Sequence, residues 1–185
     1  DSLDAQVDWR WTPRQALGAG AMISDEQASS ESYGERMRAD TRQLNLFVQD
    51  RIESGAHRAL AAIGYTDHET AGDAVTGNLE YGHTLAGGTL LYGLAGSGFR
   101  APDATDRYGF GGNPDLEPER SRNFEVGVRH KFAGRHAVSL SAFRNDIDDL
   151  IEFVTLSYEP FVGENRNVDE ARIEGVEATY EYDAA

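Results

Sequence analysis

The most constraining feature of this sequence is an alternation of apolar and polar side chains with a period of two. It is clearest in residues 3–11, and it recurs in 124–132 and 176–182. A period of two puts successive side chains on opposite faces of a β-strand. Weaker alternation, with more Gly or Ala, marks six further candidate strands: 16–24, 42–53, 58–67, 75–84, 89–99 and 136–147. The sequence therefore predicts an all-β chain, an antiparallel meander of about nine strands.

The connections between these strands alternate between short and long. The short turns are predicted at 12–15, 54–56, 86–88 and 133–135. The long polar loops are predicted at 25–41, 68–74, 100–120 and 148–170. In an antiparallel meander every second connection lies at the same end, so the tight turns share one rim and the long loops share the other. Outer-membrane barrels have this arrangement, with short periplasmic turns and long extracellular loops.

Strand length and the placement of aromatic residues also fit a membrane-spanning strand. Ten residues span about 33 Å, and a tilt of about 45° reduces this to about 23 Å, close to the apolar band of about 25 Å. Trp9 and Trp11 lie beside the turn at 12–15, where an interfacial aromatic girdle belongs, and Tyr180 and Tyr182 lie toward the same rim. The mean hydropathy of −0.54 is compatible with this, because half of such a strand faces water.

The alternation also predicts which face each side chain takes. On the strand at 124–132, we expect Val126 and Val128 to face lipid. Glu125, Arg129 and Lys131 would then face a water-filled lumen.

Composition excludes several other classes of protein. No run of about 18 apolar residues is present, which excludes a transmembrane helix. With 17 Lys+Arg against 32 Asp+Glu, the net charge is −15, which disfavours a nucleic-acid partner. The absence of Cys excludes disulfides, thiolate metal sites and cysteine catalysis. The chain starts at Asp1 with no signal-peptide apolar region, so we expect a mature or excised segment.

Five motifs in the second half of the chain resemble those of TonB-dependent outer-membrane receptors. They are FRAP at 99–102, GNPDLEPE at 112–119, NFEVG at 123–127, AFRNDIDDLI at 142–151, and NV followed by ARIEGVEA at 167–178. The resemblance implies that residues 1–185 are part of the barrel domain of such a receptor, a 22-stranded barrel around an N-terminal plug. It also implies residence among outer-membrane lipids and uptake energised by the TonB complex through the plug. We expect the plug and the other strands to lie outside these residues.

Within that superfamily, three stretches are similar to the cobalamin (vitamin B12) receptors. They are YGFGGNP at 108–114, FRNDIDDLIEF at 143–153 and ARIEGVEAT at 171–179. This similarity implies an importer whose transported ligand is cobalamin, with no resident cofactor and no covalent chemistry. Calcium binding by the full-length protein stays open. The alternatives are a siderophore (ferric chelate) receptor of the same superfamily, a soluble all-β binding domain and an outer-membrane barrel enzyme.

Ligand contact is expected where the long loops gather. Aromatic side chains there suit a large planar ligand such as a corrin. Two polar candidates, Arg107 and Asn113, lie in the loop predicted at 100–120. The candidates are Tyr33, Arg107, Tyr108, Phe110, Asn113, Tyr158 and Phe161. The Ser, His and acidic residues form no hydrolase constellation, so we predict that the chain is not an enzyme. The acidic run at 146–152 lacks the EF-hand pattern and the histidines are scattered, so no metal site is assigned.

Overall fold

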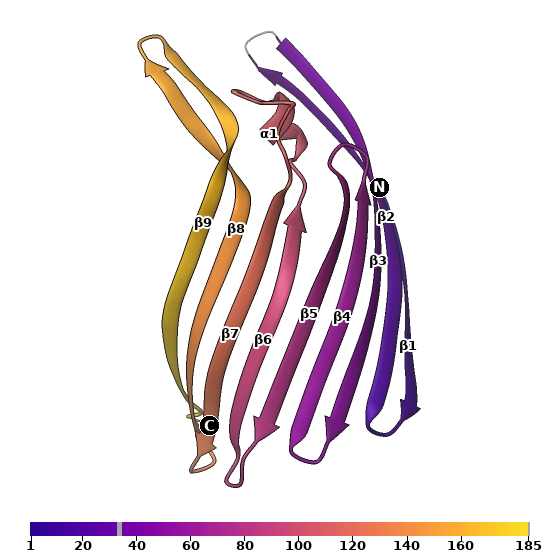
Figure 1. Cartoon of the computed structure of the whole chain (residues 1–185), viewed down its shortest axis with the longest axis vertical. Helices are drawn as coiled ribbons and strands as arrows, with labels where there is room; N and C mark the ends of the chain where they lie inside the picture. The colour runs from indigo at the N-terminus through magenta and orange to yellow at the C-terminus, as the bar shows by residue number, and fades with distance from the viewer. Residues whose placement is uncertain (33–34, 185) are drawn as a thin grey trace.

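The computed structural model describes residues 1–32 and 35–184. They form one antiparallel sheet of nine strands in sequence order, with one short helix at its upper rim (Figure 1). The strands are β1 (Ser2–Thr12), β2 (Gln15–Ser32), β3 (Glu35–Ser54), β4 (His57–His68), β5 (Gly72–Thr84), β6 (Thr89–Arg100), β7 (Glu119–Phe132), β8 (His136–Tyr158) and β9 (Phe161–Tyr182), and the helix is α1 (Ala104–Tyr108). The predicted all-β meander is confirmed, and each of the nine predicted segments lies within one of these strands.

The short connections lie together at one end of the sheet. Figure 1 shows the β1–β2, β3–β4, β5–β6 and β7–β8 turns at its lower end, and we call this end the turn rim. Gly55 and Gly134 occupy these turns with φ of 59° and 70°, a left-handed conformation that favours glycine. The opposite end, the loop rim, carries the β4–β5, β6–β7 and β8–β9 connections, as the parity of a meander requires, and of these the β6–β7 connection is the long one.

Strand register gathers the apolar side chains on one face. Val128 of β7 lies opposite Leu91 of β6 and Leu140 of β8. Leu140 in turn lies opposite Ala178 of β9. Directly opposite residues share a face of the sheet, so such rows form a continuous apolar face. The first strands contribute a matching row: Val7, Ala19, Val48 and Ile63.

The other face of the sheet carries charged side chains of β7. Glu125, Arg129 and Lys131 alternate with Val126 and Val128 along β7, so they lie on the face opposite the apolar rows. This confirms the predicted alternation on β7.

The apolar face is bounded at both rims. Toward the loop rim, every strand except β6 places a charged residue directly after its last apolar one on this face: Asp1, Asp25, Arg42, Asp67, Asp73, Arg122, Arg144 and Glu174. Toward the turn rim, the face ends in aromatic or imidazole rings on β1, β4, β5, β7, β8 and β9, whereas β3 carries Asp50 on this face. A band of this kind, apolar in the middle with aromatic rings at its border, has the pattern of a lipid-facing barrel wall.

The rings at the turn rim pack on one another. Trp9 and Trp11 have centroids 6.1 Å apart. On the β7–β9 side of the same rim, the ring of His136 lies 5.0 Å from that of Phe132 and 5.0 Å from that of Tyr182. The tryptophans, Tyr180 and Tyr182 thus lie at the turn rim as expected, and His136 stacks among the rings there. Their place at a membrane interface stays a prediction.

Three of the predicted long loops are wrong, and the one predicted at 68–74 is reduced to residues 69–71 between β4 and β5. Residues 25–41 and 148–170 were expected to be loops, but the structure continues the strands through most of both segments. β2 and β3 stay paired as far as Ser32 and Glu35, and β8 and β9 stay paired to their tip. Residues 25–41 are mostly polar, so this stretch looks like a loop, although the backbone ladder needs no apolar face to continue. The extension of β8 carries apolar residues such as Ile151 and Phe153, but with no clear period.

Neither face of this single-layered sheet is covered by another layer. Within the described part of the chain, the buried hydrophobic residues are Ala74 and Leu116. Val126 in the middle of the apolar face is 63% exposed. Among the same residues no helix is long and apolar enough to cross a membrane. The apolar face must therefore meet its partner outside these residues, because a sheet of this kind is stable only when that face is buried.

Candidate ligand-binding surface at the loop rim

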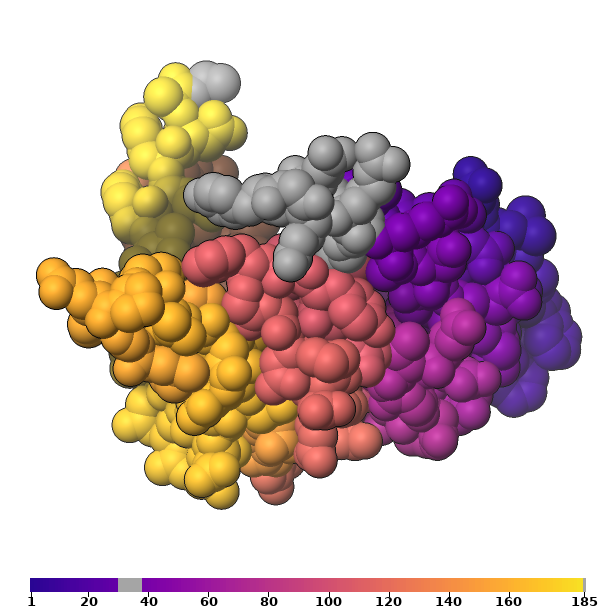
Figure 2. All heavy atoms as spheres, turned by 90° about the horizontal axis from the view of Figure 1, so that it is seen from above, coloured from indigo at the N-terminus to yellow at the C-terminus, as the bar shows by residue number. Residues whose placement is uncertain are grey.

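The connection between β6 and β7, residues 101–118, is here called the rim loop. It was predicted to be irregular throughout, but it contains α1, which begins with a capping box. The Asp103 carboxylate accepts from the Asp106 N–H at 2.7 Å, and the Asp106 carboxylate accepts from the Asp103 N–H at 3.1 Å. Such reciprocal bonds satisfy two backbone donors at a helix start and fix the direction of the chain. Seen from above, the rim loop lies between the β8–β9 hairpin and the part of the chain around β4 (Figure 2).

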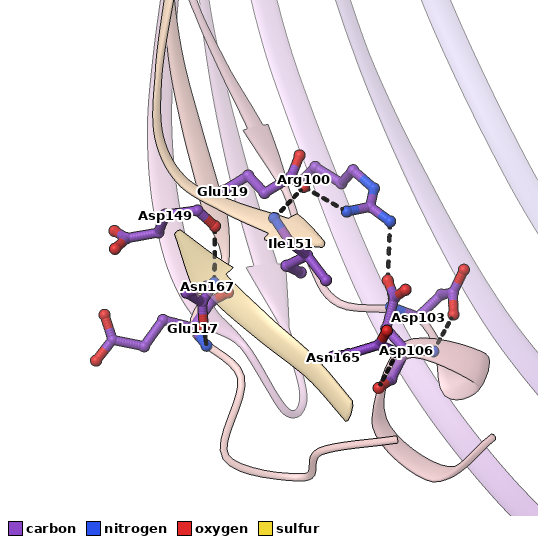
Figure 3. Close-up of polar contacts among 9 residues, drawn as sticks. All are labelled: Arg100, Asp103, Asp106, Glu117, Glu119, Asp149, Ile151, Asn165 and Asn167. Carbon is purple, nitrogen blue, oxygen red and sulfur yellow. Dashed lines mark hydrogen bonds and ion pairs between the residues drawn. The ribbon is translucent and has the colours of Figure 1, made fainter. Parts of the chain in front are cut away.

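Ion pairs hold the two ends of the rim loop together. Arg100, the last residue of β6, donates from Nη1 to Glu119 at 2.7 Å and from Nη2 to Asp106 at 2.8 Å (Figure 3). The same oxygen of Glu119 accepts from the backbone N–H of Ile151 on β8 at 2.9 Å. Two motif residues, Arg100 and Glu119, therefore connect the start of the loop, its end and the neighbouring strand.

Two asparagines of β9 hold the body of the rim loop. Asn165 donates from Nδ2 to the carbonyl of Asp106 at 2.9 Å (Figure 3). Asn167 donates from Nδ2 to the carbonyls of Glu117, at 2.9 Å, and Asp149, at 2.7 Å. Its Oδ1 accepts from the N–H of Glu117 at 2.9 Å. An asparagine amide has two donor hydrogens and an acceptor oxygen, and Asn167 uses all three on backbone groups.

The predicted candidate Asn113 is also part of this framework. Its Nδ2 donates to the carbonyl of Asn165 at 3.2 Å, and its Oδ1 accepts from the N–H of Asp115 at 3.0 Å. The backbone N–H of Asn165 donates to the carbonyl of Gly111 at 2.6 Å. Asn113 is therefore occupied in shaping the loop.

The predicted candidates Arg107 and Tyr108 lie on α1. Arg107 donates from Nη2 to the carbonyl of Pro114 at 2.6 Å, which closes the loop across its width. The guanidinium carbon of Arg107 lies 5.8 Å from the centroid of the Tyr108 ring, within cation–π range. Tyr108 is exposed, so its ring can meet a ligand, whereas Arg107 is committed in part to the loop.

Three phenylalanines meet at the upper edge of this surface. Phe110 of the rim loop and Phe161 of β9 are 6.1 Å apart with an interplanar angle of 5°. Phe153 of β8 lies 6.0 Å from Phe110 and 6.2 Å from Phe161, at angles of 23° and 19°. The centroids form a nearly equilateral triangle of almost parallel rings, here called the aromatic platform. The platform combines two predicted residues with Phe153, which sequence reasoning missed.

Glycines on both sides make room for the platform. A Cβ atom on Gly163 would lie 2.5 Å from Cζ of Phe153, and Gly111 has a φ of 66°. Neither position can take a side chain without moving the ring or straining the backbone. The signal for Phe153 in the sequence was its place in the 143–153 motif, but its partners come from segments that only the fold brings together.

The other aromatic candidates are not part of the platform. Tyr158 lies at the tip of the β8–β9 hairpin, 82% exposed, opposite Phe161 in the strand register. Tyr33 lies outside the described residues. Within the described chain, no group of three or more His, Asp or Glu residues could hold a metal ion.

His68 gives the loop rim a pH-dependent element. It lies beyond Asp67, where the apolar row on β4 ends, and its Nδ1 accepts from the N–H groups of Thr70 at 3.4 Å and Ala71 at 3.2 Å. Burial, followed by the nearby charge of Arg107, lowers the pKa of His68 from its ordinary value near 6.5.

A lowered histidine pKa means that the neutral ring stabilises the fold. This stabilisation is complete above about pH 6.5 and is lost as the pH falls through the lowered value. We expect the amides of residues 70 and 71 in the full-length protein to exchange faster with solvent below that pH. Hydrogen exchange measured between pH 5 and 8 tests this, with the amides of the β3–β4 turn as the control. Equal pH dependence at both turns, after correction for intrinsic exchange, would contradict it.

The sheet with its apolar band, turn rim and built-up loop rim defines the wall of an outer-membrane type of β-barrel. The family model described as TonB dependent receptor-like, beta-barrel, matches residues 2–185, and the chain belongs to this family.

Known relatives of the chain include receptors with different cargoes. It is 30% identical over 176 residues to "Vitamin B12 transporter BtuB" of Vibrio vulnificus (strain YJ016), covering 91% of this chain and 28% of that protein. Among solved structures it is similar to the siderophore receptor PirA from Pseudomonas aeruginosa, with a TM-score of 0.83, 22% identity, and 96% of this chain and 36% of that chain covered. A ferric enterobactin receptor (PfeA) from Pseudomonas aeruginosa gives a TM-score of 0.79 and 20% identity, covering 96% of this chain and 32% of that chain. The chain thus spans about a third of the length of these relatives or less, and the structural likenesses show the fold alone.

Proposed function

We propose that this chain is part of an outer-membrane active transporter that binds and imports cobalamin, with uptake energised by the TonB complex. The observation that carries the substrate is the 30% identity, across 91% of the chain, to a protein named as a vitamin B12 transporter. The stretches that are similar to cobalamin receptors also contain Tyr108, Phe110, Asn113 and Phe153 of the loop rim. The proposed process is transport without covalent chemistry, so cobalamin is cargo and no resident cofactor is required.

The geometry supports a separate role for each face of the sheet and for the loop rim. The apolar face would contact lipid, and the polar face would line the lumen and meet the plug through which TonB acts. The loop rim, with its fixed loop and exposed aromatic rings, would contribute to ligand capture at the cell exterior. Binding there needs a large, partly apolar surface, which the aromatic platform and Tyr108 supply.

A siderophore receptor is the second candidate function. It is favoured by the fold likeness to PirA and to PfeA, which are described as receptors for a siderophore and for ferric enterobactin. At 22% and 20% identity those likenesses support the barrel fold, and they do not favour a siderophore over cobalamin as the cargo.

Uptake by the full-length receptor distinguishes the two cargoes. We expect it to restore uptake of radiolabelled cyanocobalamin in cells that lack their own cobalamin receptor, and to leave ferric enterobactin outside. The same cells without a working TonB complex serve as the control and should show no uptake. Uptake of the ferric chelate without cobalamin would replace our proposal with the siderophore alternative.

A further inference from the structure

The rim loop and the upper part of the β8–β9 hairpin are joined so that neither can move alone. We propose that Asn165 and Asn167 are positioning residues that lock the two into one preformed unit, and that the aromatic platform on this unit receives the flat ring system of cobalamin. The inference rests on the proposed function for the identity of the ligand. Its first part, the lock, concerns only this chain.

The lock is made mainly of hydrogen bonds, and the stacking of Phe110 on Phe153 and Phe161 adds an apolar contact to it. Within its described residues, Pro102 and Leu116 are the buried ones. Asn165 and Asn167 together make four bonds to backbone groups, at 2.7 to 2.9 Å, on both sides of the loop and on β8. A loop without an apolar core opens readily unless its polar backbone groups are held in this way. Loss of these side chains should therefore loosen the loop without disturbing the sheet below, while the bonds made by Asn113 and by the backbone N–H of Asn165 remain.

The platform exists only while the lock holds. Phe110 belongs to the rim loop, whereas Phe153 and Phe161 belong to the two strands of the hairpin. The three rings meet at 6.0 to 6.2 Å only when the loop lies against the hairpin. If the loop moved away from the hairpin, Phe110 would leave the platform, and only the rings of Phe153 and Phe161 would remain in contact. A surface assembled before binding saves the entropy of ordering it during binding, so the lock should raise affinity without touching the ligand.

The platform suits a flat ring system. Its three rings have no polar atoms, their planes agree within 23°, and all three are exposed, by 63%, 42% and 53% for Phe110, Phe153 and Phe161. Parallel exposed rings offer stacking area to a flat partner, and they offer no charge to a compact ionic one. In the proposed function the flat partner is the corrin ring system of cobalamin.

The platform is tested by truncation in the full-length receptor. Phe110→Ala and Phe153→Ala should each weaken the binding of cyanocobalamin about tenfold. The control is Trp11→Ala, which removes an exposed ring at the turn rim, at the opposite end of the sheet from the platform, and it should bind like the parent. Parent-like binding by both Phe variants would overturn the platform.

The lock is tested by measuring the distance between the rim loop and the hairpin with spin labels. Labels can be placed at chosen sites because these 185 residues contain no Cys. Any cysteine elsewhere in the receptor is first replaced, and spin labels are attached at Asp115→Cys on the rim loop and Glu159→Cys on the hairpin tip. We expect a narrow distance distribution, which the double variant Asn165→Ala with Asn167→Ala should broaden. Asn167→Asp, which loses both donors and places a carboxylate oxygen against the carbonyls of Glu117 and Asp149, should broaden it as well. Asn78→Ala is the matched control, because that amide donates to Glu80 on its own strand at 2.9 Å.

Further readouts separate positioning from stability and from the choice of cargo. The double variant should associate with cyanocobalamin about tenfold more slowly, while its urea unfolding midpoint stays that of the parent. An unchanged distance distribution would overturn the lock. If the receptor binds a ferric chelate and no cobalamin, the proposed cargo fails, but the distance measurement still decides the lock. If cobalamin binds and the variants bind it equally well, the inference fails and the proposed function stands.

Discussion

Replacement of Val126 by arginine in the full-length receptor should lower the free energy of unfolding by about 2–4 kcal/mol. Val126 lies on the apolar face near the middle of β7, opposite Gly93 of β6 and Ala142 of β8. If this face meets lipid, a guanidinium at this depth loses its hydration and finds no carboxylate at the same level. Urea unfolding in liposomes measures the effect.

Glu125 provides the matched control for this prediction. It is the adjacent residue on the same strand, its side chain lies on the polar face, and it accepts a hydrogen bond from the Tyr92 hydroxyl at 2.9 Å. Glu125→Arg introduces the same group and removes that bond, so a cost of about 1 kcal/mol is expected. The difference between the two variants reports which face is in lipid. Equal costs, or a larger cost for Glu125→Arg, would contradict the barrel orientation.

The fold could be predicted from the sequence because the strands carry their own signal. Where one face meets lipid and the other meets water, alternation is enforced at every residue, as in 3–11 and 124–132. The same physics explains the wrong loops at 25–41 and 148–170. Above the apolar band water lies on both sides, so strict alternation is no longer enforced, and only the backbone ladder shows that β2, β3, β8 and β9 continue.

The candidate site could be predicted only in part. Phe110 and Phe161 are aromatic residues in segments that must reach the loop rim, and composition was sufficient to select them. Phe153 lies in a stretch with no clear period, and its role depends on the ladder that sets it beside Asn165. The asparagines bond to backbone atoms of the rim loop about 50 residues away in sequence. Contacts of that kind have no local signature, because any backbone carbonyl can accept them.

The 185 residues expressed alone should fail to form a soluble monomer. The sheet runs from β1 to β9 without closing, so both end strands expose unpaired N–H and C=O groups. Such edges pair readily with other chains in water, and hydrocarbon cannot satisfy them. Within the described residues the buried hydrophobic side chains are those of Ala74 and Leu116. A single-layered sheet with this little buried apolar surface cannot offset the conformational entropy of ordering it.

We therefore expect the isolated segment to aggregate, or to stay dispersed only in detergent, and to bind no cobalamin. Aggregation would proceed through the open strands and the apolar face, since both are accessible at once. Size-exclusion chromatography without detergent, followed by thermal unfolding of any monomer fraction, measures this, with the full-length receptor in detergent as the comparison. A sharp monomer peak with a cooperative melt would mean that the nine strands bury their apolar face by themselves. The apolar face would then be the core of a soluble domain, and its assignment to lipid would be wrong.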